Sequence, residues 1–202
     1  MPDLLIAGRL ERPLILGSTS RYRRELLSRL QLPFETVSPE VDETPLSGET
    51  PHDLSLRLAI AKAQAVARLH PGAIVIGSDQ VPELDGQPLS KPGTHERATE
   101  QLRQMSGRQM NFHTGVCVSC AETSFTESSV VTVQVRFREL SDVEIERYLR
   151  AEQPYDCAGS AKSEGLGIAL LDAIVSDDPT ALIGLPLIRT CQLLRAAGVV
   201  LP

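Results

Sequence analysis

The segment "ILGSTSRYRRELL" at residues 15–27 places hydroxyl side chains directly after an apolar run, and cations directly after the hydroxyls. Leucines then recur at helical spacing, and Ser20 is a suitable N-cap for the predicted helix. A helix N-terminus favours acidic neighbours, so cations there indicate either a bound anion or a solvated surface. Hydroxyls, free backbone N–H groups and guanidinium groups together can hold a phosphate. The candidate groups are Ser18, Thr19, Ser20, Arg21, Arg23 and Arg24.

Asp79, in "IVIGSDQV", is the strongest candidate for an acid or a base. It comes just past the carboxyl end of a predicted buried strand, at the edge where open α/β sheets bind ligands. The alternative is a loop aspartate that caps a turn. Lys62 lies in an Ala-rich predicted helix, Lys91 follows a predicted hairpin, and Glu43 lies in an acidic loop. Each alone is more simply a surface residue, but together they supply cations for a polyphosphate and carboxylates for a divalent metal or a water.

A segment rich in glycine and serine, "CAGSAKSEGLGI" at residues 157–168, carries Lys162 and Glu164. Glycine lets the backbone approach another group closely. A flexible connector is the alternative, although a predicted helix before the segment and a predicted strand after it anchor both ends. The segment is therefore a second candidate for contact with a ligand.

Composition excludes several classes of function. The chain has 202 residues, of which 42% are hydrophobic, enough for one compact domain with a full core. Its net charge of -6 provides no broad basic field for a nucleic acid, so the arginine cluster indicates a small phosphorylated ligand. No apolar stretch approaches transmembrane length, and residues 1–12 are predicted to be an extension without the apolar core of a signal peptide. We expect a cytoplasmic protein without membrane contact.

The cysteines and histidines do not indicate a metal centre. Cys117 and Cys120 form a CxxC, but in a predicted strand their side chains point to opposite faces. Cys157 and Cys191 are isolated in the sequence, so a structural zinc site is not expected. The histidines have no metal-ligand spacing, and each is expected at the surface or in a loop. They are His52, His70, His95 and His113.

Helix and strand signals alternate through the first half of the chain, which predicts an α/β fold with a central mixed sheet flanked by helices. Strands are predicted at 14–16, 32–37, 73–77, 112–120, 130–137 and 165–171. Helices are predicted from Ser20, from Thr50 to about His70, over 95–106, from a Ser141–Glu144 capping box, and over 184–198. A DG turn within 83–89 predicts a hairpin. A single domain over 13–202 is expected, with the stretch around 120–150 a candidate for a smaller lobe.

Short motifs follow one another along residues 13 to about 198: "LILGSTSRYRRELL", "VDET", "RLAIAKAQ", "IGSDQV", "LSKP", "CAGSAKSEGLGI" and "GLPLI". The set resembles the Maf family of nucleotide pyrophosphatases. The resemblance implies an α/β fold similar to inosine triphosphate pyrophosphatase, and hydrolysis of a nucleoside triphosphate between its α and β phosphates. It also implies a divalent metal cofactor (Mg, Mn or Co) and, as a family-level expectation, a homodimer.

The resemblance also implies a role for each matching residue. Asp79 would be the general base, and Glu43 would hold the metal. The phosphate-binding residues would be Ser18, Arg23, Arg24, Lys62 and Lys91, and the residues that select the base would be Tyr22, Gln80 and Glu164. "SDQ" and "KSEG" are similar to the branch acting on 7-methyl-GTP. The alternatives are the branch acting on dTTP and UTP, and a nucleotide-binding regulator of septum formation.

Overall fold

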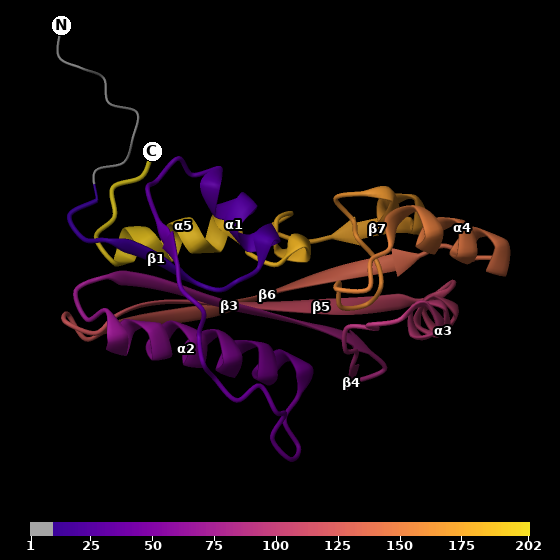
Figure 1. Ribbon diagram of the computed structural model, residues 1–202, viewed down its shortest axis with the longest axis horizontal. Coiled ribbons are helices and arrows are strands. Elements are labelled where there is room, and N and C mark those ends of the chain that lie inside the picture. The colour runs from indigo at the N-terminus through magenta and orange to yellow at the C-terminus, as the bar shows by residue number, and fades with distance from the viewer. Residues whose placement is uncertain (1–9) are drawn as a thin grey trace, which may run out of the picture.

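The computed structural model describes residues 10–202, so most of the predicted extension at 1–12 lies outside the described residues. The fold is α/β, as predicted, around a seven-stranded mixed sheet with strand order β2-β1-β3-β5-β6-β7 and with β4 paired to β3 (Figure 1). The strands are β1 (Leu14–Gly17), β2 (Glu35–Thr36), β3 (Ile74–Leu84), β4 (Gln87–Pro88), β5 (Gln109–Cys120), β6 (Phe125–Phe137) and β7 (Leu171–Val175). The helices are α1 (Arg21–Ser28), α2 (Pro51–Leu69), α3 (His95–Met105), α4 (Asp142–Glu152) and α5 (Leu187–Ala196), with 3₁₀ turns at Leu166–Leu170 and Ala181–Ile183.

Helices cover both faces of the sheet (Figure 1). Helix α2 lies along one face of the sheet, and α1 and α5 lie on the opposite face. Helices α3 and α4 lie at the end of the molecule that is distant from the C-terminus. Strands β2, β1 and β3 are parallel, whereas β5, β6 and β7 are antiparallel to their neighbours. Both crossover and hairpin connections are therefore present. None of the described helices is long and apolar enough to cross a membrane.

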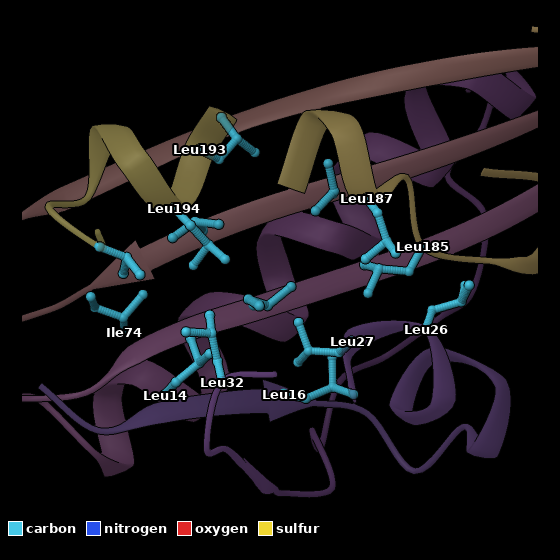
Figure 2. Packing of buried hydrophobic residues seen from close by; sticks show 14 of the residues in the cluster. Leu14, Leu16, Leu26, Leu27, Leu32, Ile74, Leu185, Leu187, Leu193 and Leu194 are labelled. Atoms are coloured by element: carbon cyan, nitrogen blue, oxygen red, sulfur yellow. The ribbon is translucent and has the colours of Figure 1, made fainter. Parts of the chain in front are cut away.

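Leucines build the core on the α1 and α5 side. Leu26 and Leu27 of α1 and Leu193 and Leu194 of α5 are buried against apolar residues of β1, β3 and β5 (Figure 2). Burying one leucine side chain contributes about 1.5–3 kcal/mol. This cluster therefore fixes α1, which begins directly after the predicted ligand groups of residues 18–20.

Helix α2 packs close to the sheet because small residues face each other. A Cβ atom at Gly77 of β3 would lie 2.3 Å from the carbonyl oxygen of Ala59, and one at Gly115 of β5 would lie 2.3 Å from that of Ser55. Only glycine allows so close an approach of two backbones. The contact brings Lys62, in the middle of α2, directly over β3.

The helix starts agree with the predicted caps. Ser20 and Thr50 each accept a hydrogen bond from the backbone N–H three residues later. Both reciprocal contacts of the Ser141–Glu144 capping box are present. The predicted alternation of β6 is also confirmed, because its apolar side chains are buried under α3 and α4 and the intervening polar ones are exposed. The buried residues are Val131, Val133, Val135 and Phe137.

Strand β3 is longer than predicted. The sequence predicts a strand that ends at Gly77, but β3 continues to Leu84 because β5 supplies an antiparallel partner along the whole stretch. Asp79 therefore lies within a strand, paired with Gly115, and not in a loop past its end. Strand β1 does end at Gly17, opposite Gly77. Asp79 thus lies beyond the carboxyl end of β1, at the kind of edge where open α/β sheets bind ligands.

The prediction of a strand at 165–171 is wrong. Most of this run forms the 3₁₀ turn Leu166–Leu170, and β7 begins only at Leu171. A Cβ atom at Gly167 would lie 2.6 Å from backbone atoms of Lys162, so the chain folds back closely on itself here. The turn is also held from outside, since Leu166 N donates to Glu152 Oε2 at 2.8 Å.

The two cysteines of the CxxC lie on opposite faces, as predicted, with Cys117 on the α2 side and Cys120 in the cluster on the α1 and α5 side. The prediction of a surface or loop position is wrong for His113. It is 6% exposed in β5. Its Nε2 contacts Glu83 Oε2 at 2.5 Å and its Nδ1 contacts Thr132 Oγ1 at 2.9 Å. These partners come from neighbouring strands, which the sequence pattern around His113 does not reveal.

Candidate active site

Two adjoining cavities open where β1 and β3 separate. The first, of about 540 Å³, is lined by Asp79, Lys62 and Glu43, and we call it the Asp79 cavity. The second, of about 390 Å³, is lined by Tyr22 and Glu164, and we call it the Tyr22 cavity. The residues that line both are Thr19, Ser20, Arg23, Gln80, Lys91 and Ala158. With Ser18, which lines the Asp79 cavity, every predicted site residue except Arg24 borders one of the two.

Asp79, Lys62 and Glu43 form a chain of ion pairs. Lys62 Nζ lies 2.7 Å from Asp79 Oδ1 and 2.6 Å from Glu43 Oε1. The side chains of Lys62 and Asp79 are only 7% and 12% exposed, whereas that of Glu43 is 60% exposed. The surface position that is usual for such a lysine is therefore not found, because the close packing of α2 on Gly77 carries Lys62 inward.

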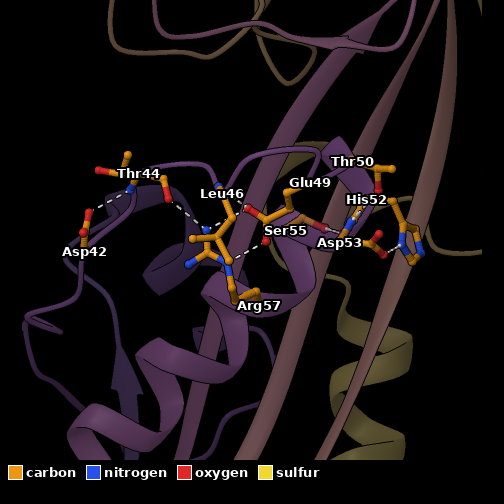
Figure 3. A network of polar contacts seen from close by, with 9 residues as sticks. All are labelled: Asp42, Thr44, Leu46, Glu49, Thr50, His52, Asp53, Ser55 and Arg57. Carbon is orange, nitrogen blue, oxygen red and sulfur yellow. Dashed lines mark hydrogen bonds and ion pairs between the residues drawn. The ribbon is translucent and has the colours of Figure 1, made fainter.

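The acidic loop that carries Glu43 is held by α2 (Figure 3). Arg57 donates to the two carboxylate oxygens of Glu49 at 2.6 and 2.9 Å, and to the carbonyl oxygen of Thr44 at 3.0 Å. Leu46 N donates to Glu49 Oε2 at 3.0 Å. The Arg57 guanidinium lowers the pKa of Glu49, so the pair stays ionised. Because Glu43 directly precedes Thr44, this network sets the position of its backbone.

Arg23 lies at the junction of the two cavities. Its Nε donates to the carbonyl oxygen of Gly184 at 2.8 Å, and its Nη1 donates to Ser18 Oγ at 3.4 Å. Burial lowers the pKa of Arg23, while the carboxylates of Asp79 and Glu43 oppose that shift. A guanidinium keeps its proton in proteins, so Arg23 presents a fixed, partly buried positive charge to any ligand.

Arg24 and Lys91 differ in their relation to the site. Arg24 is exposed and, among residues 10–202, lines neither cavity. Consecutive residues of a helix are about 100° apart around its axis, so Arg23 and Arg24 of α1 do not face the same cavity. Lys91 is also exposed, but it lines both cavities. The structure therefore brings Lys91 to the site and leaves Arg24 outside it.

The sequence analysis includes "GLPLI" at 184–188 among its motifs, but it does not predict that the segment at 176–188 lies against Arg23. Asp178 is 2% exposed, and its Oδ2 accepts from the backbone N–H groups of Ile188 and Arg189 at 2.7 and 3.2 Å. This buried carboxylate thereby caps α5 and fixes the segment that contains Gly184, whose carbonyl oxygen accepts from Arg23. The sequence "SDDPT" is typical of a turn, but nothing in it reveals these partners.

Gln80 binds the same segment. Its Nε2 donates to the carbonyl oxygens of Ala181 and Leu182 at 2.8 and 3.0 Å, and lies 3.1 Å from Thr114 Oγ1. An amide nitrogen has only two hydrogens to donate, so protein groups satisfy it. The carbonyl oxygen of Gln80 is therefore the group that can contact a ligand.

The guanidinium group of Arg21 lies over one face of the Tyr22 ring. Arg21 Cζ lies 4.7 Å from the ring centroid, and Arg21 Nη2 donates to Tyr22 Oη at 2.6 Å. Cys157 Sγ lies 3.7 Å from the same oxygen. Burial raises the pKa of Tyr22 and raises that of Cys157 to about 11, so both are neutral at pH 7. The opposite face of Tyr22 is the one on which a ligand ring can stack.

Lys162 and Glu164 have different environments, although they are close in sequence. Lys162 Nζ donates to Glu152 Oε1 at 2.6 Å, and Lys162 N donates to Tyr148 Oη at 3.0 Å. The pair with Glu152 raises the pKa of Lys162. These contacts hold the segment at 157–168 against α4. Glu164 is exposed and lines the Tyr22 cavity.

Comparison with known proteins identifies the family of this chain. A family model for Maf-like proteins matches residues 13–197. The chain belongs to the Maf family. It is 68% identical to the 7-methyl-GTP pyrophosphatase of Polaromonas sp. (strain JS666), over 94% of this chain and 87% of the relative. Proteins of the same name from Albidiferax ferrireducens and Bordetella pertussis are 63% and 60% identical, over 94% and 92% of this chain and 96% and 92% of each relative.

In this member of the Maf family, the carboxylates of Asp79 and Glu43 suit a metal ion that the protein and a ligand bind together. Among residues 10–202, no group of three or more His, Cys, Asp or Glu side chains could hold an ion. Asp79 Oδ1 and Glu43 Oε1 lie 2.7 and 2.6 Å from Lys62 Nζ, so the two oxygens are at most about 5.3 Å apart. Two oxygens bound to one Mg²⁺ are about 3 to 4 Å apart. Mg²⁺ usually takes one or two carboxylates together with substrate phosphates, which matches this pair.

Proposed function

We propose that this chain hydrolyses a nucleoside triphosphate between the α and β phosphates, and that its substrate is 7-methyl-GTP. The products are 7-methyl-GMP and pyrophosphate. The observation that carries the proposal is Asp79, an almost buried carboxylate in a cavity that is also lined by Arg23, Lys62 and Lys91. A protein that only binds nucleotides has no need of a carboxylate facing the phosphates. The relatives named 7-methyl-GTP pyrophosphatase, at 60–68% identity, support the choice of substrate.

The cations of the Asp79 cavity bind the triphosphate. Arg23, Lys62 and Lys91 offset the negative charge that builds on the leaving pyrophosphate, and the Ser18 hydroxyl is a further hydrogen-bonding group. The phosphates also explain the arginine at the start of α1, because their negative charge compensates both the guanidinium and the positive end of the helix. Arg24 lies outside the cavities and has no part in this binding.

Asp79 accepts a proton from the water that attacks the α-phosphate. General bases of this kind contribute roughly 10²- to 10⁴-fold to the rate. The pairing of Asp79 with Gly115 in β3 and β5 fixes its backbone, and a fixed geometry is what proton transfer and in-line attack require.

Glu43 and Asp79 would hold the divalent cation together with phosphate oxygens. When bound, such an ion polarises phosphoryl oxygens and offsets their charge. Glu43 is exposed enough to meet an ion that arrives with its ligand, since its side chain is 60% exposed. The choice among Mg, Mn and Co is part of the proposal and is measured by metal replacement.

The Tyr22 cavity selects the base. A guanine methylated at N7 carries a delocalised positive charge and keeps two donors on its Watson–Crick edge. The free face of Tyr22 can stack on it, with a cation–π contribution of about 0.5–2 kcal/mol. Glu164 can accept from both donors and balance the positive charge. Pyrimidine triphosphates offer neither the charge nor the paired donors.

One panel of substrates tests the proposal. Purified protein is given 7-methyl-GTP, GTP, dTTP or UTP with Mg²⁺, and both pyrophosphate and orthophosphate are measured. We expect pyrophosphate release to be fastest from 7-methyl-GTP, slower from GTP and slowest from the pyrimidine nucleotides. The Asp79→Asn variant, purified in parallel, controls for contaminating phosphatases.

Each alternative predicts a different result. A preference for dTTP or UTP would overturn the choice of substrate and leave the reaction standing. Orthophosphate as the product would move cleavage to the β–γ bond. Binding of all four nucleotides without hydrolysis would favour the regulator of septum formation. A homodimer and a cytoplasmic location stay predictions, which light scattering and cell fractionation can measure.

A further inference from the structure

The buried ammonium of Lys62 stands between the two carboxylates that fit a divalent cation. It lies 2.7 Å from Asp79 Oδ1 and 2.6 Å from Glu43 Oε1, and its side chain is only 7% exposed. An ammonium group has three N–H donors and no acceptor. Two of these donors meet the two carboxylates, so Lys62 is their counterion when no ligand is bound.

Lys62 and a divalent cation cannot occupy this position together. Mg²⁺ binds its oxygens at about 2.0–2.1 Å, closer than Lys62 Nζ lies to the same oxygens. An ion that binds these same two oxygens therefore requires the ammonium to leave both of them. An ammonium that stays buried without a counterion is strongly unfavourable, so metal binding to the free protein is opposed.

A triphosphate removes this opposition. Its phosphate oxygens are acceptors for the three donors of Lys62, which borders the same cavity as Arg23 and Lys91. When Lys62 leaves Asp79 and Glu43, the negative charge of the phosphates takes the place of these two counterions. The carboxylate pair becomes available to the metal only at that point.

We propose that Lys62 is an internal counterion that keeps divalent cations off the Glu43–Asp79 pair until a triphosphate binds. The part that concerns the triphosphate rests on the proposed function. Coupling of this kind is reciprocal, so the metal strengthens triphosphate binding by the same factor as the triphosphate strengthens metal binding. The metal is thus acquired with each substrate and is not a permanent constituent of the free protein.

The experiment measures Mn²⁺ binding to the nucleotide-free protein, by the loss of the electron paramagnetic resonance signal of free Mn²⁺. We compare the unsubstituted protein with Lys62→Met and Lys62→Gln, which remove the charge. Lys91→Met is the matched control, because Lys91 lines the same cavity and is exposed. We expect both Lys62 variants to bind Mn²⁺ roughly tenfold or more tightly than the unsubstituted protein, as in ordinary cases of coupling, and Lys91→Met to bind it unchanged.

The proposal is overturned if neither Lys62 variant binds Mn²⁺ more tightly, or if Lys91→Met has the same effect. Circular dichroism checks that the variants fold. If they do not, the unsubstituted protein labelled with ¹⁵N-lysine gives the answer. Mg²⁺ without nucleotide should leave the ammonium resonance of Lys62 in place, because Lys62 keeps its contacts with Asp79 and Glu43. Mg²⁺ together with a non-hydrolysable triphosphate should shift that resonance. A shift of the Lys62 resonance with Mg²⁺ alone would contradict the proposal. Neither measurement uses turnover, so failure of the proposed reaction and failure of this inference are separate results.

Discussion

Arg23 and Gly184 lie 161 positions apart in the sequence, yet Arg23 Nε donates to the carbonyl oxygen of Gly184 at 2.8 Å. The same carbonyl accepts from Ser78 Oγ at 3.0 Å, one residue before Asp79. The segment at 176–188, which contains Gly184, therefore contacts both the start of α1 and the middle of β3. Through this contact, the guanidinium at the junction of the two cavities is placed relative to the proposed base.

Arg23→Ala should weaken catalysis, whereas Arg24→Ala should not. The first variant removes a charged hydrogen-bonding group at the site, worth about 1.5–3 kcal/mol, so kcat/KM should fall roughly 10- to 100-fold. Arg24 is exposed and lines neither cavity within residues 10–202, so its loss should change kcat/KM less than about threefold. Pyrophosphate release measures both, and equal losses in the two variants would contradict the placement of Arg24.

Asp79→Asn should remove most turnover and, when no divalent metal is present, leave nucleotide binding nearly intact. The amide cannot accept the proton, so kcat should fall by roughly 10²- to 10⁴-fold, while Lys62 keeps its contact with Glu43. Calorimetric titration with a non-hydrolysable triphosphate measures binding independently of turnover. A variant that keeps more than half of the activity would show that Asp79 is not the base.

Glu164→Ala should reduce the preference for 7-methyl-GTP over GTP. Loss of the carboxylate removes the charge that balances the methylated base, so the ratio of the two kcat/KM values should fall by about tenfold. Asp156→Ala is the control, because Asp156 is exposed and lines the same Tyr22 cavity. An equal effect of both variants would indicate a general effect of charge rather than recognition of the base.

Gly77→Ala should damage both stability and activity, although no atom of Gly77 is proposed to touch the substrate. The added Cβ atom would lie 2.3 Å from the carbonyl oxygen of Ala59, so α2 must move away from β3 and carry Lys62 with it. Overpacking of this kind costs about 1–3 kcal/mol of unfolding free energy. Gly17→Ala is the control, since the nearest atoms there lie at 3.4 Å. Thermal unfolding and kcat/KM are measured together, and an unchanged melting temperature would contradict the close packing.

Cys157 should react slowly with iodoacetamide at pH 7.5. Burial raises its pKa to about 11, which makes its thiolate roughly a few hundredfold scarcer than that of an ordinary cysteine. Mass spectrometry of the alkylated peptide gives the rate, with glutathione as an internal standard. Alkylation as fast as that of glutathione would show that the thiol is not protected, and protein unfolded in urea should react at the ordinary rate.

Local signals in the sequence predicted most of the fold. The caps at Ser20 and Thr50, the capping box at Ser141 and the alternation in β6 depend on neighbouring residues, so a single sequence reveals them. The end of β3 and the 3₁₀ turn at Leu166–Leu170 depend on distant partners, and both were predicted wrongly. Asp79 was still placed at the correct edge of the sheet, because β1 ends where β3 was expected to end.

Side-chain partners in the site were the least predictable feature. Nothing near Lys62 in the sequence shows that glycines in β3 and β5 draw α2 inward. The contact of Lys162 with Glu152 likewise depends on how the segment at 157–168 folds back on α4. Arg23 and Arg24 are adjacent in an arginine cluster, and only the orientation of α1 distinguishes them. Motif resemblance names Arg24 together with Arg23 as phosphate-binding, whereas among residues 10–202 only Arg23 of the two lines the cavities.

The position of Asp79 inside a central strand has a consequence for heat inactivation. Strand β3 pairs with β1 as far as Gly77 and with β5 from Val75 to Glu83. Central strands exchange their amide hydrogens only when the whole domain opens, whereas loops open locally at much lower cost. On heating, the proposed base should therefore keep its place until the sheet itself melts. Residual activity after a heat pulse would then follow the cooperative melting of the sheet, with no earlier phase from local loosening around the base.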